Sequence, residues 1–257
     1  MVRTMDKKLH ALPTDLTVVY PESDGKPMAE TDFHYEIMTE MIDTLKERYA
    51  EHHDVYVAGN LIVYYQEAQP KKFLAPDVFV VFGVEKKKRR TYRLWEEGKG
   101  PDFVLEVASQ STCDYDLGEK KDLYASILGV QEYYLYDPDK RYLPLPLLGF
   151  RLVKGVYVPI QAVEGRLPSD TLGLELGEEG GRLRLYNPLT KEWVLKPAEQ
   201  AKAEARQAEA KARQAQARAQ RAEAKAQQEA LARQQAEAEL ARLRAELERL
   251  RTSSTHP

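Results

Sequence analysis

Hydrophobic residues recur at helical spacing between residues 31 and 50. Ile37, Met41 and Leu45 lie four positions apart, with acidic residues at several of the positions between them. Such spacing places apolar side chains on one face of a helix, and Thr31 or Asp32 can cap its first turn. The pattern therefore predicts an amphipathic helix that packs against a core.

The pattern changes to β-branched and aromatic residues from residue 54 onward. Residues 54–66, with Gly59-Asn60 as a turn signal, predict a hairpin. Residues 75–84 predict a strand that begins just after a proline. Residues 102–109 predict another strand, and its unbroken apolar run is typical of burial on both faces. The charged residues 85–100 are expected to connect these two strands.

Helical and extended patterns alternate again after residue 110. Residues 114–129 predict a helix that Gly118 weakens, and residues 131–138 predict a strand that ends at Asp137-Pro138. Short strands and many turns follow up to residue 197. Together these patterns predict an α/β fold with a mixed central sheet flanked by helices in a domain of residues 31–197, after an irregular lead-in at residues 1–30.

The last part of the chain has a different pattern. Beyond residue 197 there is no glycine and no aromatic residue, and positions from Ala201 to Leu250 repeat at alternating four- and three-residue steps. This heptad spacing predicts a long helix at residues 198–251 that forms a coiled coil with a second copy, as a homo-oligomer and most simply a dimer. The alternative is a single solvated helix. Residues 252–257 are expected to be a disordered end.

Charge and composition limit the function classes. The tail holds 12 Lys and Arg against 9 acidic residues, so the preceding 197 residues carry a net charge of −6. An acidic body argues against strong nonspecific binding to DNA, although it allows a local basic cleft. The single cysteine, Cys113, permits no internal disulfide, the start shows no signal-peptide pattern, and the longest apolar run is too short to cross a bilayer. We expect a cytoplasmic protein without a membrane segment.

Acidic residues occupy positions that are costly for them. Glu106 lies inside an apolar strand, Asp77 follows Pro76 at the start of another strand, and Glu36 lies on the first helix. An unpaired carboxylate costs several kcal/mol to bury, so such an acid needs a cation, a hydrogen-bond network or a raised pKa. Two or three acids that converge can bind a hard divalent ion, Mg²⁺ or Mn²⁺. A lysine at the same place suits phosphodiester hydrolysis.

The helix after the Glu106 strand can supply that lysine. Asp116, Lys120 and Tyr124 recur at four-residue steps and share one helix face. If this face packs over the end of the strand, Lys120 can reach Glu106. A structural ion pair between Glu106 and Lys120 is the simpler interpretation of the same spacing.

Four segments together resemble a known family. "PDVFVV", "PDFVLEVASQST", "DLGEKKDLY" and "LGVQEYYLYDP" resemble the Uma-two family of restriction endonucleases, which belongs to the PD-(D/E)XK nuclease superfamily. The resemblance covers most of the body. It implies a restriction-endonuclease-like fold and a magnesium-dependent endonuclease, a hydrolase that acts on DNA.

The resemblance also implies roles for individual residues. Asp77 would be the acid of the PD element and Glu106 the acid of the E-x-K element, and both would bind the metal. The lysine of E-x-K is missing, because its position is Ala108. Lys120 would replace it as the third catalytic residue, with Lys121 on another face as the fallback.

Other residues match the family less firmly. Tyr124 resembles the tyrosine after the lysine, and Glu36 resembles an extra acid on the first helix, so both are auxiliary candidates. His34 matches a family position without a derivable role. The missing E-x-K lysine and the acidic body leave an alternative, a non-catalytic nucleic-acid-binding or scaffolding protein on a nuclease fold. In either case the cluster "KKKRR" at residues 86–90 is expected to be a charged loop, and phosphate contact is its alternative role.

Overall fold

The structure of the protein is a computed structural model that describes residues 18–22 and 31–253. The chain divides into two units, Met1–Pro197 and Ala198–Pro257. Most of the expected lead-in, and residues 254–257 of the expected disordered end, lie outside the described residues.

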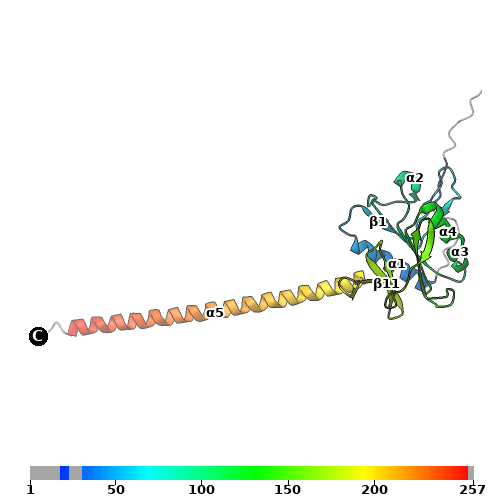
Figure 1. The fold of residues 1–257 in the computed structure, drawn as a ribbon. Helices are drawn as coiled ribbons and strands as arrows, with labels where there is room; N and C mark the ends of the chain where they lie inside the picture. Colours follow the sequence, from blue (N-terminus) through cyan, green and yellow to red (C-terminus); the bar gives the residue numbers. More distant parts are fainter. Residues whose placement is uncertain (1–17, 23–30, 254–257) are drawn as a thin grey trace, which may run out of the picture. The chain divides into compact units, whose positions relative to one another are not determined.

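A six-stranded mixed sheet forms the centre of the first unit (Figure 1), with strand order β1-β4-β6-β7-β8-β9. Only β6 and β7 pair in parallel, and the other neighbours are antiparallel. The predicted mixed central sheet is therefore confirmed. Its strands are β1 (Val55–Ala58), β4 (Val78–Phe82), β6 (Phe103–Val107), β7 (Glu132–Tyr136), β8 (Leu147–Val153) and β9 (Val156–Pro159).

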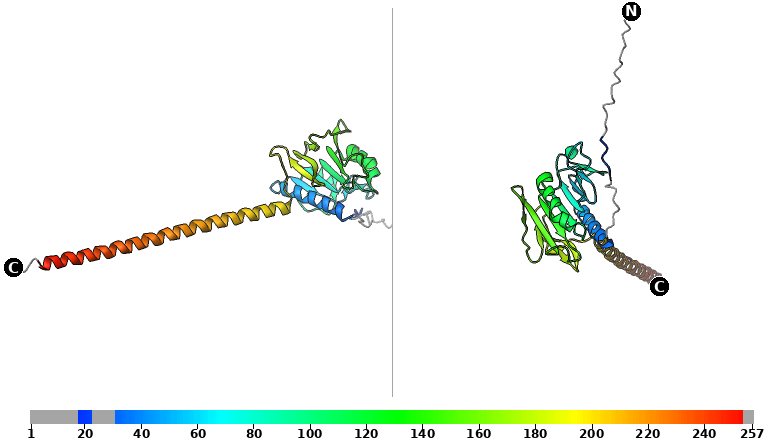
Figure 2. Two further views of the ribbon diagram at one scale, coloured as in Figure 1. Left: turned by 90° about the horizontal axis from the view of Figure 1, so that it is seen from below. Right: turned by 90° about the vertical axis from the view of Figure 1, so that its right-hand side faces the viewer.

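Helices cover both faces of this sheet (Figure 2). Helix α1 (Asp32–Arg48) packs with the alternate strand residues Val78 and Val80 in one core cluster. On the other face, Phe79 and Val104 pack with side chains of the segment that follows β6. Because successive strand side chains point to opposite faces, a strand between two helical layers is apolar throughout. All five residues of β6 are buried, as the sequence predicts.

The helical segment after β6 is not one continuous helix. It consists of α3 (Cys113–Leu117), α4 (Glu119–Leu123) and a π-helical turn, η1 (Tyr124–Leu128). The break falls at Gly118, whose φ of −106° and ψ of −106° are not helical. The weak point predicted at this glycine is therefore a real interruption.

The predicted hairpin at residues 54–66 is wrong. Strand β1 pairs with β4, whereas β2 (Val63–Tyr64) leaves the large sheet and pairs with β3 (Phe73–Leu74) and, in parallel, with β5 (Tyr92–Arg93). At Gly59-Asn60 the chain turns away, and the Asn60 N–H donates to the carbonyl oxygen of Pro76. The turn signal is real, but tertiary partners take both strands. The charged connection contains β5 and a short helix, α2 (Leu94–Glu97).

A four-stranded antiparallel sheet completes the first unit, and its apolar residues Leu174, Leu176 and Leu183 join the core cluster of α1. It comprises β10 (Leu167–Ser169), β11 (Leu174–Glu179), β12 (Arg182–Asn187) and β13 (Glu192–Trp193).

The second unit is one long helix, as predicted: α5 (Pro197–Ser253) has 57 residues and is drawn in yellow to red in Figure 1. Its leucines Leu240, Leu243 and Leu247 are 50–59% exposed. Among the helices in the described part of the chain, none is both long enough and apolar enough to span a membrane.

Candidate functional site

The register of β4 and β6 brings Asp77 and Glu106 together. Val78 pairs with Leu105 in this antiparallel ladder, and its continuation by one residue sets Asp77 opposite Glu106. Each acid is held at the backbone of the other strand. The Asp77 N–H donates to Glu106 Oε2 at 3.2 Å, and the Val107 N–H donates to Asp77 Oδ2 at 2.7 Å. The two carboxyl groups therefore share one end of the strand pair.

Lys120 reaches the same point from α4. Its Nζ lies 2.8 Å from Glu106 Oε1 and 3.2 Å from Asp116 Oδ1, and only 11% of its side chain is exposed. Lys121 instead places its Nζ 4.1 Å from the centre of the Phe150 ring. Of the two lysines named as candidates from the sequence, Lys120 is therefore the one in the acid cluster.

Tyr124 fixes the orientation of the Glu106 carboxyl group. The tyrosine is fully buried at the start of η1, and its hydroxyl donates to Glu106 Oε1 at 2.6 Å. A π-helical turn inside a helical segment is frequent at functional sites, because it re-aims the side chains on one face.

His34 is a member of the cluster for which the sequence suggests no role. Its Nε2 lies 3.2 Å from Asp77 Oδ2, and the residue is 7% exposed. His34 lies three and four residues before the buried Ile37 and Met38 of the same helix. That spacing was the signal that its ring would face inward.

Asp116 was also absent from the sequence-based set of site residues. It is 1% exposed and lies four residues before Lys120. The four-residue spacing was visible in the sequence, but its burial was not.

Glu36 does not join this cluster among the described contacts. Its carboxylate pairs with Arg182 at 3.1 Å, and 52% of its side chain is exposed. Because His34 and Glu36 lie two positions apart, they point to different sides of α1. The histidine, and not the glutamate, is the residue of the first helix that contacts Asp77.

Burial and mutual charge set the protonation of the acids. Burial raises the pKa of Glu106 to about 8 against the attraction of Lys120, and the neighbouring Asp77 and Asp116 add to the rise. Burial also raises the pKa of Asp116. For Asp77 the hydrogen bond from His34 and the charge of Lys120 outweigh burial, so its pKa is lowered. Burial opposes the charge of Lys120, but the three surrounding acids raise its pKa overall.

The carboxyl pair fits a small divalent ion. Within the described residues, Asp77 Oδ1 accepts no hydrogen bond, and Glu106 Oε2 accepts only the Asp77 N–H. No group of three or more His, Cys, Asp or Glu residues there forms a complete protein-only metal site. Mg²⁺ commonly binds through one or two carboxylates and completes its shell with water and substrate phosphate, so the donor set suits it.

The mixed sheet thus brings two acids together at one end of a strand pair, and a lysine from α4 joins them. The chain belongs to the Uma2 family: the family model, described as "Putative restriction endonuclease", matches residues 7–185. A crystal structure of "a putative nuclease belonging to DUF820" from Anabaena variabilis is similar, with 16% sequence identity and a TM-score of 0.42. The match covers 57% of this chain and 76% of the other. No curated protein matches the chain.

Proposed function

We propose that the protein is a Mg²⁺- or Mn²⁺-dependent endonuclease that hydrolyses phosphodiester bonds in DNA. One observation carries the proposal: the buried carboxyl groups of Glu106 and Asp116 both contact the single ammonium group of Lys120, and the partly exposed carboxyl group of Asp77 lies beside Glu106. When Glu106 is ionised, the cluster has an excess of negative charge that a divalent cation would balance.

Each residue has a distinct task in this proposal. Asp77 and Glu106 hold the ion, with His34 and Tyr124 fixing the two carboxyl groups through Asp77 Oδ2 and Glu106 Oε1. When bound, the ion supplies a water of lowered pKa and neutralises charge on the phosphate. The Lys120 ammonium orients the attacking water and stabilises the charge that develops on the phosphate oxygens. Lys120 thus substitutes for the lysine absent at Ala108.

Asp77→Asn tests the proposal, because it keeps the shape of the side chain and removes the charge. We expect cleavage of plasmid DNA in Mn²⁺ to fall by about 10³-fold, as for loss of a principal electrostatic group. The wild-type protein should also be stabilised by Mn²⁺, by about 2.7 kcal/mol at a hundredfold excess over Kd, and the variant should lose this gain. Melting temperatures with Mn²⁺ and with a chelator measure it.

The control is Asp114→Asn, which removes an exposed carboxylate from α3 and should leave cleavage and the Mn²⁺ response unchanged. If wild-type protein binds DNA but neither cuts it nor responds to Mn²⁺, the non-catalytic nucleic-acid-binding alternative replaces the nuclease.

We further propose that α5 pairs two copies as a parallel coiled coil. Its leucine end repeats at a and d positions, Leu240, Leu243, Leu247 and Leu250. In a parallel pair, Glu239 would face Arg244 of the partner subunit, which is a favourable g-to-e contact.

Leu243→Glu tests the pairing, because it places a charge in the seam. Light scattering should give the mass of a dimer for the full chain and of a monomer for this variant. Leu231→Glu is the matched control, since Leu231 is 57% exposed, close to the 55% of Leu243, but lies outside the a and d positions. A monomeric wild-type chain, or equal effects of both substitutions, would exclude the proposed seam.

A further inference from the structure

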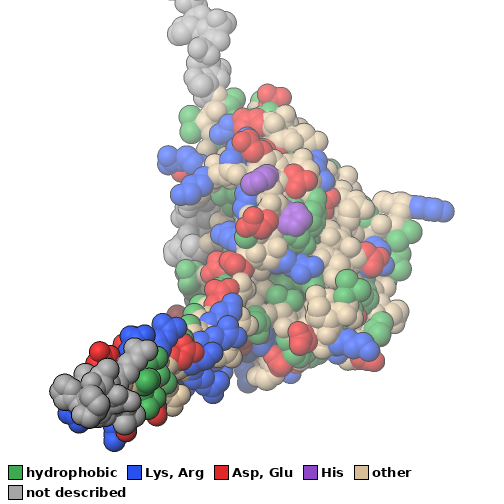
Figure 3. Space-filling model, turned by 90° about the vertical axis from the view of Figure 1, so that its left-hand side faces the viewer, with side chains coloured by type: hydrophobic (Ala, Val, Ile, Leu, Met, Phe, Trp, Pro, Cys, Tyr) green, Lys and Arg blue, Asp and Glu red, His purple; other side chains and the backbone are tan. Residues whose placement is uncertain are grey.

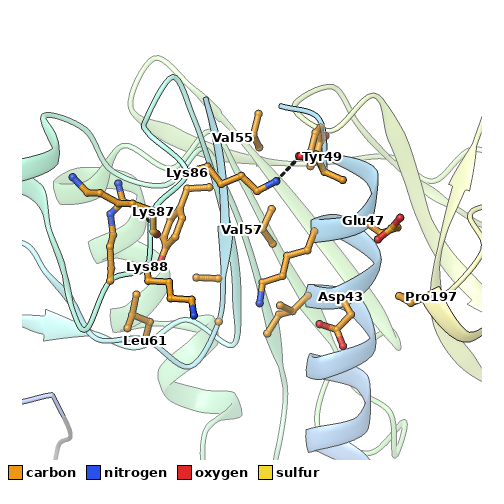
Figure 4. A pocket seen from close by; sticks show the side chains of 17 residues that line it. Asp43, Glu47, Tyr49, Val55, Val57, Leu61, Lys86, Lys87, Lys88 and Pro197 are labelled. Atoms are coloured by element: carbon orange, nitrogen blue, oxygen red, sulfur yellow. Dashed lines mark hydrogen bonds between the residues drawn. The ribbon is translucent and has the colours of Figure 1, made fainter. Parts of the chain in front are cut away.

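A groove of about 840 Å³ runs beside the edge strand β1 (Figure 4). The C-terminal half of α1 forms one wall, and the segment of residues 86–89 forms the other. Ile42, Val55, Val57 and Leu61 give it an apolar lining. Lysines from both walls line it as well, together with the acidic residues Asp43 and Glu47 of α1. We call this feature the α1–β1 groove.

Two of its cations are engaged in holding the fold. Lys86 Nζ donates to the carbonyl oxygens of Tyr49 and Ala50 at 2.9 and 2.8 Å, at the C-terminal end of α1. Arg89 makes a two-point pair with Glu97 at 2.7 Å, and only 3% of its side chain is exposed. These groups build the walls of the groove and are not available to a ligand.

A third cation of the lining, Lys87, lies 3.6 Å from Glu85 and 3.9 Å from Glu97. The remaining two are available. Lys46 on α1 and Lys88 on the opposite wall are exposed, and neither contacts an acidic partner among the described residues. Figure 4 shows Lys88 extending toward the Leu61 end of the groove, whereas Lys86 points toward Tyr49. On the face in Figure 3, Lys and Arg lie among acidic and apolar side chains, without one broad basic field. A phosphate ligand would therefore be attracted by the two lysines of the groove and not by the charge of the whole face.

The groove lies close to the strand end that carries Asp77. Gly59 lines the groove, and a Cβ atom there would lie 2.0 Å from the carbonyl oxygen of Asp77. Only glycine lets the end of β1 pass so close to this residue. Along α1, His34 at the cluster and Ile42 at the groove are eight residues apart, which is about 12 Å at 1.5 Å per residue. The groove therefore begins within a few nucleotide spacings of the proposed reaction centre.

A peptide strand that pairs with β1 suits this groove less well than a nucleic-acid strand. Backbone groups for such pairing are present: the Asp54 carbonyl accepts from the Gly83 N–H, so by the alternation of antiparallel ladders the N–H and C=O groups of Val55 and Val57 face the open edge. The side chain of Lys86, however, stands in the way. The Lys86 N–H donates to the carbonyl of His53, and its side chain crosses to α1. A lysine placed this way obstructs strand addition, as edge lysines commonly do.

We propose that the α1–β1 groove binds the sugar–phosphate backbone of the nucleic-acid strand that is cut, with Lys46 and Lys88 contacting phosphates from opposite walls. The inference rests on the proposed function, because it assigns the path of that substrate. The ligand chemistry is a phosphodiester chain, which duplex and single-stranded DNA share.

The test replaces both free lysines, as Lys46→Gln with Lys88→Gln. The control replaces Lys154 and Lys191 with glutamine, since both are exposed, and Lys154 lies in the β8–β9 turn at the opposite edge of the same sheet. Both pairs of substitutions remove two charges. Binding of fluorescently labelled duplex and single-stranded DNA is measured in Ca²⁺ over a range of salt concentrations.

The groove variant should bind DNA about tenfold more weakly than the control, and its slope of log affinity against log salt should be shallower by about two. The DNA form, duplex or single-stranded, whose binding is weakened more in the groove variant is the form that the groove binds. Hydrolysis of bis(p-nitrophenyl) phosphate in Mn²⁺ by wild-type protein tests the proposed function separately, because a single small diester needs only the acid cluster. If wild-type protein hydrolyses neither DNA nor bis(p-nitrophenyl) phosphate, the proposed function fails. The comparison of DNA binding by the groove variant and the control still decides whether the groove binds DNA.

Two results would overturn the inference. One is equal DNA binding and equal salt slopes for the groove variant and the control. The other is binding of poly-glutamate as tight as that of DNA, lost in the groove variant alone, because this would indicate an acidic protein partner instead.

Discussion

Lys120→Met is expected to reduce DNA cleavage by about 10³-fold, within the range found when a positioned proton-transfer or charge-stabilising group is removed. Methionine keeps the length and apolar packing of the lysine stem but removes the only ammonium group within reach of Glu106 and Asp116 among the described residues. No lysine follows Glu106 at the second position, where Ala108 stands. The loss should therefore appear in kcat and in kcat/KM alike, measured on a labelled duplex.

Lys121→Met is the matched control because it removes an adjacent lysine whose ammonium group lies over Phe150, outside the cluster. It should keep cleavage within a few-fold of wild type. Lys120→Met also leaves buried acids without their cation, which costs about 3–5 kcal/mol when the charges persist. Circular dichroism at the assay temperature must confirm that the variant is folded. Folded Lys120→Met protein that cuts at the wild-type rate would remove Lys120 from the mechanism.

The parts of the fold that could be predicted from the sequence are those with strong local patterns. The apolar run of β6, the amphipathic face of α1 and the continuous helix of α5 each follow from spacing alone. The hairpin at residues 54–66 could not be predicted correctly, because β1 pairs with β4, and β2 pairs with β3 and β5, instead of with each other. A turn signal gives the position of a turn and not the partners of the strands around it.

The site residues likewise divide into features visible from neighbouring residues in the sequence and contacts that depend on the tertiary fold. The burial of Glu106 and the four-residue step from Asp116 to Lys120 are visible in the sequence. The contact between Asp77 and Glu106 depends on the register of two antiparallel strands, which the sequence does not give. The costly positions of the two acids and the family resemblance suggested only that they converge. The contact of His34 with Asp77 depends on how α1 crosses the end of the sheet. The resemblance suggested Glu36 as the helix acid, but the crossing directs this residue toward Arg182.

Glu106→Gln is expected to abolish cleavage and yet to stabilise the metal-free protein as the pH rises. Burial raises the pKa of Glu106 from 4.5 to about 8 in the folded protein. The folded state therefore holds a proton that the unfolded state loses, and wild-type stability falls as pH rises through this interval. The favourable contribution is complete below about pH 4.5 and is lost as the pH passes about 8. Glutamine does not titrate, so its relative stability should grow by up to about 1.4 kcal/mol per pH unit.

Divalent metal is expected to reverse the order of stability, so that wild-type protein becomes more stable than Glu106→Gln. In the proposed site the ion needs ionised Glu106, so Mn²⁺ should stabilise wild-type protein more strongly as the pH approaches about 8, and should not stabilise Glu106→Gln. Chemical denaturation with a chelator and with Mn²⁺, between about pH 5 and pH 9, separates the two effects.

Glu132→Gln is the matched control, because Glu132 is equally buried on the neighbouring β7 but is bound by Arg151 and Ser169. This substitution should cost stability and leave the Mn²⁺ response intact, since its partners are structural. A Glu106→Gln protein that is less stable than wild type at every pH without metal would mean that its pairing with Lys120 outweighs the cost of burying its charge. Glu106 would then be a structural ion-pair partner. The opposite result would show a site that gives up stability to keep a metal-binding carboxylate buried, as functional sites commonly do.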